Sequence, residues 1–353
     1  MSSLRAVKYL AGYSIPITAV ISMSMHGIAV FITPFYAFVF LAFLEMILPP
    51  DHKNLKAMEA ELAKKDKVYD ILLYFHLPVQ FAVLVYFLIQ VNEQGLAGYE
   101  IAGRIISMGI CCGVIGINVG HELGHRVNKT EQRMAQLLLM SSLYMHFFIE
   151  HNKGHHKRVS TPEDPSSARM HEPIYFFFVR TIIFSIQSAW QIQCQELREA
   201  GRKIISAHNT LLVFFIVETI FVLAIGFFIG WVVMSYFLIA AGIGILLLES
   251  VNYIEHYGLR RQLKSSGLYE RVQPWHSWNS DFVLGRVVLY ELTRHSDHHY
   301  LASKKYQTLN YNEEAPQLPA GYPAMILLAL IPPLFFRVMH PRIKALEFQH
   351  STV

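Results

Sequence analysis

The sequence predicts an all-α membrane protein in which six transmembrane helices carry a cytoplasmic, histidine-rich helical cap that binds metal. Hydrophobic residues make up 53% of the 353 residues and charged residues 16%, whereas a soluble domain carries about 25% charged residues. Six windows approach the roughly 20 apolar residues that a helix needs to cross a bilayer. Nine of the 18 histidines gather in four short clusters, and the three cysteines offer neither a disulfide framework nor a CxxC metal site.

The apolar windows give the expected spans. Their predicted bounds are residues 10–25, 28–48, 71–91, 96–120, 211–229 and 232–250. The whole chain, residues 1–353, is expected to form one membrane domain with cap segments 121–208 and 251–353. Segments 174–190 and 322–336 are also apolar, but an arginine interrupts the first and a proline pair the second. We expect both to lie at the membrane surface rather than to cross it.

The basic residues predict the orientation, because Lys and Arg remain on the cytoplasmic side of short loops. With both termini in the cytoplasm, 29 of the 30 Lys and Arg residues fall on that side. Arg104, in the fourth span, is the exception. Glu100 precedes it by four residues, a helical spacing at which the two side chains can neutralise each other.

Each histidine cluster lies beside a span on the cytoplasmic side. The clusters read HELGHR at 121–126, EHNKGHH at 150–156, NYIEHYG at 252–258 and RHSDHH at 294–299. A lone HExxH match would more often be a solvated helix end than a metal site, but four clusters together favour metal binding. Nine imidazoles exceed the four ligands of tetrahedral zinc, so we expect two ions. Imidazole suits Zn, Cu, Fe and Ni, and the ligand type alone leaves the metal open.

Helix spacing predicts how the rings converge. Residues four apart share a helix face, so His121 is expected to point with His125, and His151 with His155. The doublets at 155–156 and 298–299 offer a neighbouring ring to a second ion. The expected ligands are His121, His125, His151, His155, His156, His256, His295, His298 and His299.

Carboxylates beside the clusters are candidates to support the ligands. Four of them adjoin a cluster histidine: Glu122, Glu150, Glu255 and Asp297. Such a carboxylate can orient a metal-bound ring by accepting its second N–H, and solvated charge at a helix end is the alternative. Glu249, Asn252 and His256 form one helical stripe. A carboxylate at membrane depth is energetically costly, so the presence of Glu249 there indicates a function. We expect Glu249, Asn252 and Asp297 to support catalysis without binding metal.

The clusters together resemble the histidine boxes of the integral-membrane alkane 1-monooxygenases, a branch of the histidine-box superfamily of membrane desaturases and hydroxylases. The boxes are HELGHR, EHNKGHH and LTRHSDHH, and NYIEHYGL is the segment that sets alkane and xylene monooxygenases apart from desaturases. TPEDPSSAR at 161–169 and PWHSWNSD at 274–281 are also similar to family segments. Thr293 departs from the glutamine that usually precedes the third box.

This resemblance implies that the nine histidines hold two irons in a bacterial inner-membrane enzyme. It implies O2-dependent hydroxylation of the terminal methyl group of medium-chain linear alkanes to 1-alcohols. An unactivated C–H bond offers no handle for acid–base or nucleophilic catalysis, which agrees with a redox metal. The chain has no motif for haem, flavin or nicotinamide, so the resemblance also implies electrons from a rubredoxin that a reductase supplies.

Charge and hydrophobicity predict where the partners bind. An acidic rubredoxin would be steered to the cytoplasmic side, where 29 basic residues outnumber 21 acidic ones. The expected docking residues, which adjoin the ligands, are Arg126, Lys157, Arg158 and Arg294. The alkane is expected to enter from the bilayer along the bundle interior, because its transfer from water into lipid is favourable by about 0.8 kcal/mol per CH2. We expect no nucleic-acid partner.

Other functions fit part of the pattern. A xylene-type or fatty-acyl membrane hydroxylase or desaturase of the same superfamily would use the same boxes. An intramembrane zinc protease would use HELGH with Glu122 as general base, but it leaves most clustered histidines unexplained. A metal carrier should line a path through the bilayer with ligands, whereas these collect at one face.

Overall fold

The computed structural model describes residues 2–351, and in them it has helices and two isolated β-bridges but no strand. Six helices are long and apolar enough to cross a membrane, as the sequence predicts. They are Ser3–Ser24, Gly27–Ile47, Lys67–Gln90, Gly98–Gly124, Thr210–Phe228 and Trp231–His256. The ends of the predicted domain, residues 1, 352 and 353, lie outside the described residues. The chain is an integral membrane protein.

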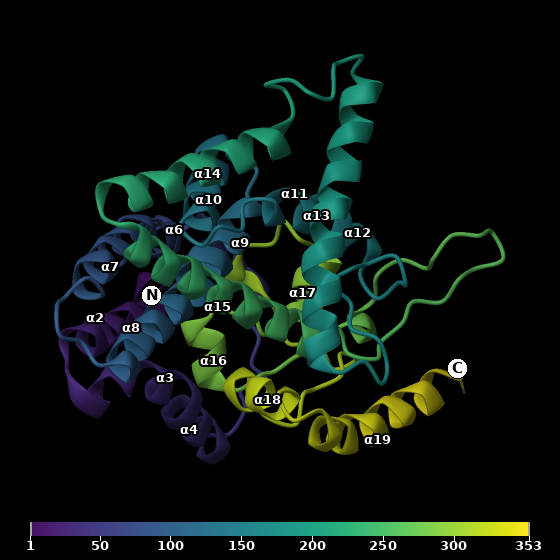
Figure 1. The fold of residues 1–353 in the computed structure, drawn as a ribbon. Helices are drawn as coiled ribbons and strands as arrows, with labels where there is room; N and C mark the ends of the chain where they lie inside the picture. The colour runs from purple at the N-terminus through teal and green to yellow at the C-terminus, as the bar shows by residue number, and fades with distance from the viewer. Residues whose placement is uncertain (1, 352–353) are drawn as a thin grey trace.

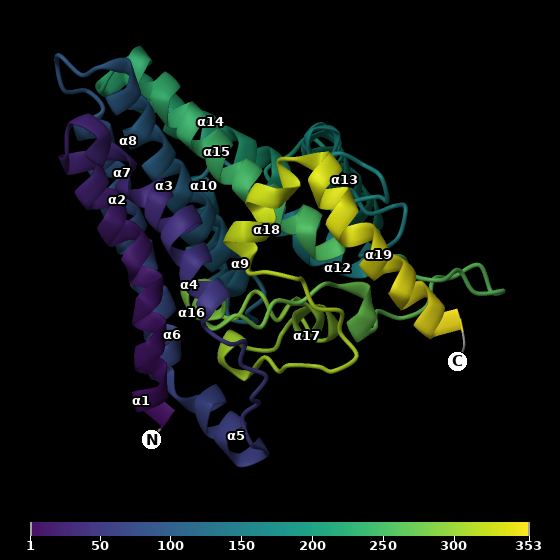
Figure 2. The same cartoon turned by 90° about the horizontal axis from the view of Figure 1, so that it is seen from below.

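The elements of the six spans follow in chain order, and four of the spans consist of more than one helix. They are α1 (Ser2–Ala6), the 3-10 helix η1 (Val7–Tyr13) and α2 (Ser14–Ser24); η2 (Gly27–Phe31), α3 (Ile32–Phe35), the π-helix η3 (Tyr36–Phe40) and α4 (Leu41–Ile47); α6 (Lys67–Tyr74) and α7 (His76–Gln90); α8 (Gly98–Cys111), the π-helix η4 (Cys112–Ile117) and α9 (Asn118–Gly124); α14 (Thr210–Phe228); and α15 (Trp231–His256). Figures 1 and 2 show the spans packed side by side, with the cap against one end of the bundle.

The fourth and sixth spans run farther than the sequence predicts. The fourth ends at Gly124 instead of residue 120, and the sixth at His256 instead of residue 250. Both extensions consist mainly of buried residues, because the cap packs around them. The helices therefore continue past the apolar stretch and carry their histidines into the cap.

Arg104 has a different partner from the one predicted. Its side chain is fully buried, and Nη1 donates to Glu93 Oε2 at 2.8 Å and to the Gln90 carbonyl. Glu100 instead accepts from the backbone N–H groups of Gly27, at 2.7 Å, and Ala97, at 2.9 Å. Glu100 thus caps helix ends at the turn between spans, a contact that helical spacing alone does not reveal.

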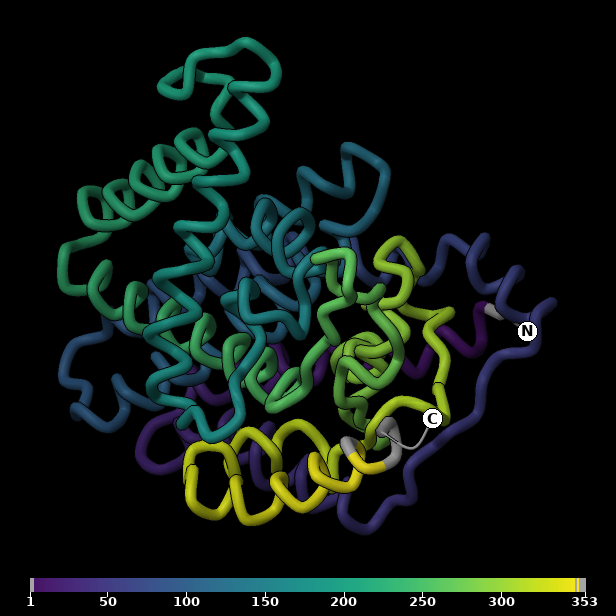
Figure 3. Tube along the Cα trace, turned by 90° about the vertical axis from the view of Figure 1, so that its right-hand side faces the viewer, coloured from purple at the N-terminus to yellow at the C-terminus, as the bar shows by residue number. Residues whose placement is uncertain are grey.

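The cap is built from two long helices, α13 and α19, together with shorter helices and loops around the ends of the fourth and sixth spans. Its elements are α5 (Ala57–Lys65), α10 (Lys129–Met140), α11 (Phe147–Glu150), the π-helix η5 (His151–His155), α12 (His156–Arg158), α13 (Ile174–Glu199), η6 (Pro274–His276), α16 (Val283–Val288), α17 (His295–Tyr300), η7 (Tyr306–Thr308), α18 (Tyr322–Ala329) and α19 (Pro332–Ser351). Residues from all parts of the chain meet here, as the tube in Figure 3 shows.

The two ambiguous apolar segments form helices that differ from the six spans. Helix α13 exposes Tyr175, Val179 and Ile183, which are spaced four apart on one face. Helices α18 and α19 are bent by 119° relative to each other at the break before Pro332, and Figure 3 shows α19 along one edge of the molecule. An exposed apolar face and a sharp bend are both compatible with helices that rest on the membrane.

Candidate metal centre

Five of the nine histidines form a ring of nitrogens, which we call the five-histidine cluster. Its members are His121, His125, His151, His156 and His298. Around the ring, in the order 121–125–151–156–298–121, successive Nε2 atoms lie 3.1, 3.1, 3.0, 3.2 and 3.0 Å apart. Nitrogens about 2.1 Å from one ion and at right angles to each other would lie about 3.0 Å apart. The ring therefore fits a metal ion.

The other four histidines form a second group, the four-histidine cluster. Its members are His155, His256, His295 and His299, all of them buried. The Nε2 atom of His295 lies 3.1 Å from that of His256 and 2.8 Å from that of His299. His155 Nε2 has no hydrogen-bond partner among the described residues, although it is buried. A buried nitrogen without a partner, beside three others, also fits a metal ligand.

A π-helical turn explains how the second box serves both clusters. Residues five apart become neighbours in a π-helix, and η5 covers His151–His155. His151 therefore approaches His156, while His155 turns toward the four-histidine cluster. The rings of His151 and His155 do lie side by side as predicted, stacked with centroids 5.1 Å apart, but the two residues belong to different clusters. The doublets behave as predicted, since both 155–156 and 298–299 divide between the clusters.

Gly154 makes this turn possible. A Cβ atom at this position would lie 2.4 Å from Glu150 Oε1 and 2.6 Å from Arg158 Nη2. Those two groups form an ion pair of 3.0 Å that packs across the turn. A side chain at 154 would separate them, so the turn needs glycine.

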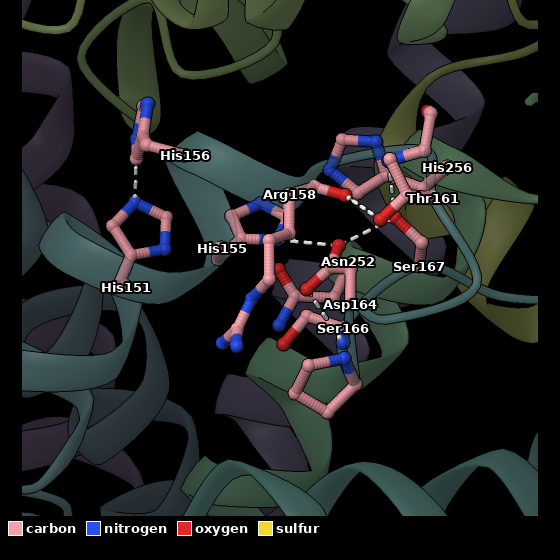
Figure 4. Close-up of polar contacts among 12 residues, drawn as sticks. His151, His155, His156, Arg158, Thr161, Asp164, Ser166, Ser167, Asn252 and His256 are labelled. Atoms are coloured by element: carbon pink, nitrogen blue, oxygen red, sulfur yellow. Dashed lines mark hydrogen bonds and ion pairs between the residues drawn. The ribbon is translucent and has the colours of Figure 1, made fainter. Parts of the chain in front are cut away.

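Asp164 orients His155, although it was not among the residues predicted from the sequence. Its Oδ2 accepts from His155 Nδ1 at 2.9 Å and from Ser167 Oγ at 2.5 Å, while Oδ1 accepts from the Ser166 N–H at 3.2 Å (Figure 4). The last contact is a local turn of the Asp-Pro-Ser sequence. Burial lowers the pKa of His155, but the charge of Asp164 outweighs it and raises the pKa. The contact fixes Nε2 as the nitrogen left for metal.

The other cluster histidines outside the spans are held neutral. Burial, followed by repulsion from neighbouring rings, holds the pKa of His151, His156 and His299 well below its ordinary value. Burial lowers the pKa of His298 to about 3, again helped by a neighbouring ring. A metal binds the neutral ring, so these sites need lose no proton near pH 7.

Three of the four box carboxylates bind basic or backbone groups instead of rings. Glu122 accepts from Arg126 Nη2 at 2.7 Å and from the Tyr306 N–H at 3.2 Å. Glu150 pairs with Arg158, and Asp297 accepts from the Asn310 N–H at 2.7 Å and pairs with Lys304. Glu255 alone of the four reaches a cluster histidine, His295. Helical spacing could not show this, because the partners come from distant segments.

Glu249 and Asn252 form a network of their own. Glu249 accepts from Tyr144 Oη at 2.6 Å, from Thr181 Oγ1 at 2.9 Å and from Asn252 Nδ2 at 3.1 Å. Among the described residues, no hydrogen bond joins Glu249, Asn252 or Asp297 to a cluster histidine. These contacts tie the sixth span to α13, so any influence on the metals is indirect.

The basic residues proposed for docking are mostly unavailable. Arg126 is 5% exposed and paired with Glu122 and Asp70. Arg294 is 3% exposed and paired with Asp281, while Arg158 is committed to Glu150. Lys157 is exposed, directly after His156. Adjacency to a ligand favours burial, so Arg126 and Arg294 offer little charge at the surface, whereas Arg158 is part-exposed.

An apolar cavity of about 80 Å³ lies between the spans and the cap. Its lining includes Ile15, Phe38, Leu41, Ile110, Val114, Asn118, Leu247, Val251, Leu289, Leu292 and Tyr322. Asn118 lies one helical turn before His121, and Leu292 three residues before His295. The cavity therefore reaches from the bundle interior toward both clusters.

Comparison with known proteins agrees with this geometry. A family model described as fatty acid desaturase matches residues 100–329, which hold all nine histidines. Alkane 1-monooxygenase from Acinetobacter baylyi is 37% identical over 317 residues, 90% of this chain and 76% of that protein. The chain belongs to the alkane 1-monooxygenase family. Alkane 1-monooxygenase 2 from Alcanivorax borkumensis is 45% identical over 254 residues, 72% of this chain.

The chain covers only part of the length of some relatives, and it is less similar to a protein outside the alkane 1-monooxygenases. The chain spans just under two thirds of the Alcanivorax borkumensis protein, 66%, and 64% of alkane 1-monooxygenase 1 from Pseudomonas aeruginosa. The hydroxylase component of a xylene/toluene monooxygenase from Pseudomonas putida is 28% identical over 322 residues, 88% of this chain. Family membership and the two clusters together identify a metal centre.

Proposed function

We propose that the protein hydroxylates the terminal methyl group of medium-chain linear alkanes to 1-alcohols with O2, at two irons held by the nine histidines. Electrons would come from a rubredoxin supplied by its reductase. The protein would lie in a bacterial inner membrane, as one domain with both termini and the cap in the cytoplasm. Alkane 1-monooxygenases that align with most of this chain support the reaction, and 29 basic residues on the cap side support the orientation.

The observation that carries the proposal is the position of the apolar cavity. It lies among membrane-spanning helices, and two residues of its lining, Asn118 and Leu292, are each three residues before a ligand, one in each cluster. An alkane partitions into the bilayer, which surrounds the helices that line this cavity. A redox metal beside it would supply the oxidant that an unactivated C–H bond requires.

The chain's own residues bind and orient the substrate. Phe38, Leu41 and Leu289 offer dispersion contacts along a linear chain. Those side chains also exclude water, while the amide of Asn118 is held away by donation to the Leu289 carbonyl at 3.2 Å. A narrow apolar space admits a chain end first, which favours oxidation at the terminal carbon. Asp164 holds His155 in the tautomer that leaves Nε2 free.

Glu122 bears on the protease alternative. A zinc protease needs this glutamate free to activate water, whereas here it is buried and bound by Arg126 and the Tyr306 N–H. The contacts of Glu122 therefore favour a structural role for this residue. The xylene-type alternative has a relative at 28% identity in its favour and shares the same chemistry.

The decisive experiment uses the purified full-length chain in lipid nanodiscs, loaded anaerobically with Fe(II). Rubredoxin, its reductase and NADH supply electrons, and octane-dependent O2 uptake is followed together with product by gas chromatography. We expect 1-octanol as the main product and two irons per chain. Predominantly internal octanols, activity with zinc alone, or a strong preference for m-xylene over octane in direct competition would contradict the proposal.

A further inference from the structure

Glu255 is the box carboxylate whose position is explained by a metal and by no basic side chain. We propose that Glu255 is itself a ligand of the ion in the four-histidine cluster, making a set of five donors, and that Tyr322 holds it in place. The inference rests on the proposed function in one respect, namely that both clusters are occupied.

The contact is with the nitrogen that faces the cluster. Glu255 Oε2 lies 3.2 Å from His295 Nε2, the same atom that lies 3.1 Å from His256 Nε2 and 2.8 Å from His299 Nε2. A carboxylate that merely orients a ring accepts from its other nitrogen, as Asp164 does from His155 Nδ1. Here His295 Nδ1 has no partner among the described residues. The carboxylate thus lies on the metal side of the ring.

The charge around Glu255 leads to the same conclusion. The side chain is 1% exposed, and no Lys or Arg in the described part of the chain forms an ion pair with it. Glu122, Glu150 and Asp297 each pair with an Arg or Lys. A buried carboxylate without a counter-charge is strongly destabilising. An ion in the four-histidine cluster would supply that charge.

The donor sets of the two clusters support this assignment. The five-histidine cluster provides five nitrogens, and the other provides four. Glu255 Oε2 is separated from His295 Nε2 by a distance similar to those between neighbouring nitrogens of the five-histidine ring. Histidine combined with carboxylate is a donor set that suits non-haem iron. With Glu255, both ions have five protein donors.

Tyr322 links this carboxylate to the cavity. Its Oη donates to Glu255 Oε1 at 2.5 Å, and its side chain lines the cavity. The hydrogen bond occupies Oε1 and leaves Oε2 for the cluster. Tyr322 is therefore a positioning residue. An alkane in the cavity would contact Tyr322, the side chain that holds Glu255 in place.

The test measures metal binding and the carboxylate itself in the full-length protein. Fe(II) affinity is determined by competition with a chelator, for wild type, Glu255→Gln and Tyr322→Phe. Infrared difference spectra, iron-loaded minus iron-free, are recorded with and without 13C-labelled glutamate. We expect Glu255→Gln to weaken one of two ions about tenfold or more and to lose a metal-dependent carboxylate band. Tyr322→Phe should keep both ions and shift that band.

Glu218→Gln is the matched control. Glu218 is another carboxyl in a span, and its Oε1 accepts from the Met145 N–H at 2.7 Å, a role that an amide oxygen can keep. It should match wild type in both measurements. Wild-type affinity for both ions in Glu255→Gln overturns the inference alone, and so does an unshifted band in Tyr322→Phe. A wild-type chain that binds no second ion overturns both the inference and the proposed function.

Discussion

The two histidine clusters differ in their exposure although they draw on the same sequence motifs. His125 and His156 of the five-histidine cluster are only part-buried, whereas all members of the four-histidine cluster are buried. The four-histidine cluster is supported by Asp164 and touches Glu255, which Tyr322 connects to the cavity. In the five-histidine cluster, successive nitrogens close a complete ring.

This difference suggests a division of roles. Because two of its rings are part-exposed, the five-histidine cluster would have the shorter electron-transfer route from a protein that docks on the cap. The four-histidine cluster is buried and has carboxylate contacts on two sides. Each histidine doublet contributes one ring to each cluster. A change at one ring should therefore affect one ion, and a change in an element that both clusters share should affect both ions.

The largest effects are expected from the adjacent pair His298 and His299. His298→Ala should remove the ion of the five-histidine cluster, and His299→Ala that of the four-histidine cluster, because each ring belongs to a different group. Each variant should retain about one iron per chain and lose alkane turnover, since direct ligands are removed. Iron content and Mössbauer spectra of 57Fe-loaded protein provide the measurement. Loss of the same spectral component in both variants would contradict the separation.

Asp164→Asn should affect the four-histidine cluster alone. The amide keeps the shape of the side chain but removes the negative charge of the carboxylate that accepts from His155 Nδ1. Loss of a carboxylate that orients a metal ligand costs roughly 10–100-fold in metal affinity. The neighbouring Glu163 is exposed, so Glu163→Gln serves as a control and should bind iron like wild type. The affinities of both ions are measured by chelator competition. Equal weakening of both ions by Asp164→Asn would show that the clusters are not independent.

The sequence identified the helical class, the number of spans and all nine histidines that the structure brings together. Those features depend on apolar length and on residue type, both of which are local. The doublets could be predicted to serve two ions, but the pairing of His151 with His156 depends on the π-turn at 151–155, which an α-helical period does not give. The partners of Asp164, Glu122 and Glu255 come from tertiary packing, so spacing along the chain could not assign them.

Glu291 stabilises the segment that carries the third box, which serves both clusters. Tyr290 and Glu291 have φ values of 54° and 58°, a conformation that L side chains rarely adopt. Glu291 accepts from Arg286 Nε at 2.7 Å and from Tyr9 Oη at 2.7 Å. Burial opposes its ionisation, but Arg286 and Lys8 outweigh that effect and lower the pKa of Glu291 to about 2.

Glu291→Gln should therefore destabilise the iron-free protein in a pH-dependent way. Because the folded pKa is below the ordinary value of 4.5, the stabilisation is complete above pH 4.5 and is lost as the pH falls toward 2. At pH 7 we expect a loss of about 3 kcal/mol, which shrinks below pH 4.5. Thermal unfolding in detergent between pH 7 and pH 3 measures it. With iron, both ions should be weakened together; selective loss of one would show that the third box does not act as a unit.

The smallest effect is expected at Lys157, the one exposed residue among the basic side chains that adjoin the ligands. It follows the part-exposed His156 of the five-histidine cluster, so an acidic rubredoxin docked for transfer to that cluster would meet its charge. Lys157→Glu should raise the apparent KM for rubredoxin a few-fold at low salt and leave kcat unchanged, since rim charges act mainly on association.

Lys203→Glu makes the same charge change in the cap beyond the far end of α13 and should leave the KM near the wild-type value. Turnover at limiting rubredoxin, measured from low to high ionic strength, compares the two variants. The difference between them should disappear as salt screens the surface charge. Equal effects of both substitutions would indicate attraction by net charge without a defined docking site. In that case electron entry could not be assigned to the five-histidine cluster.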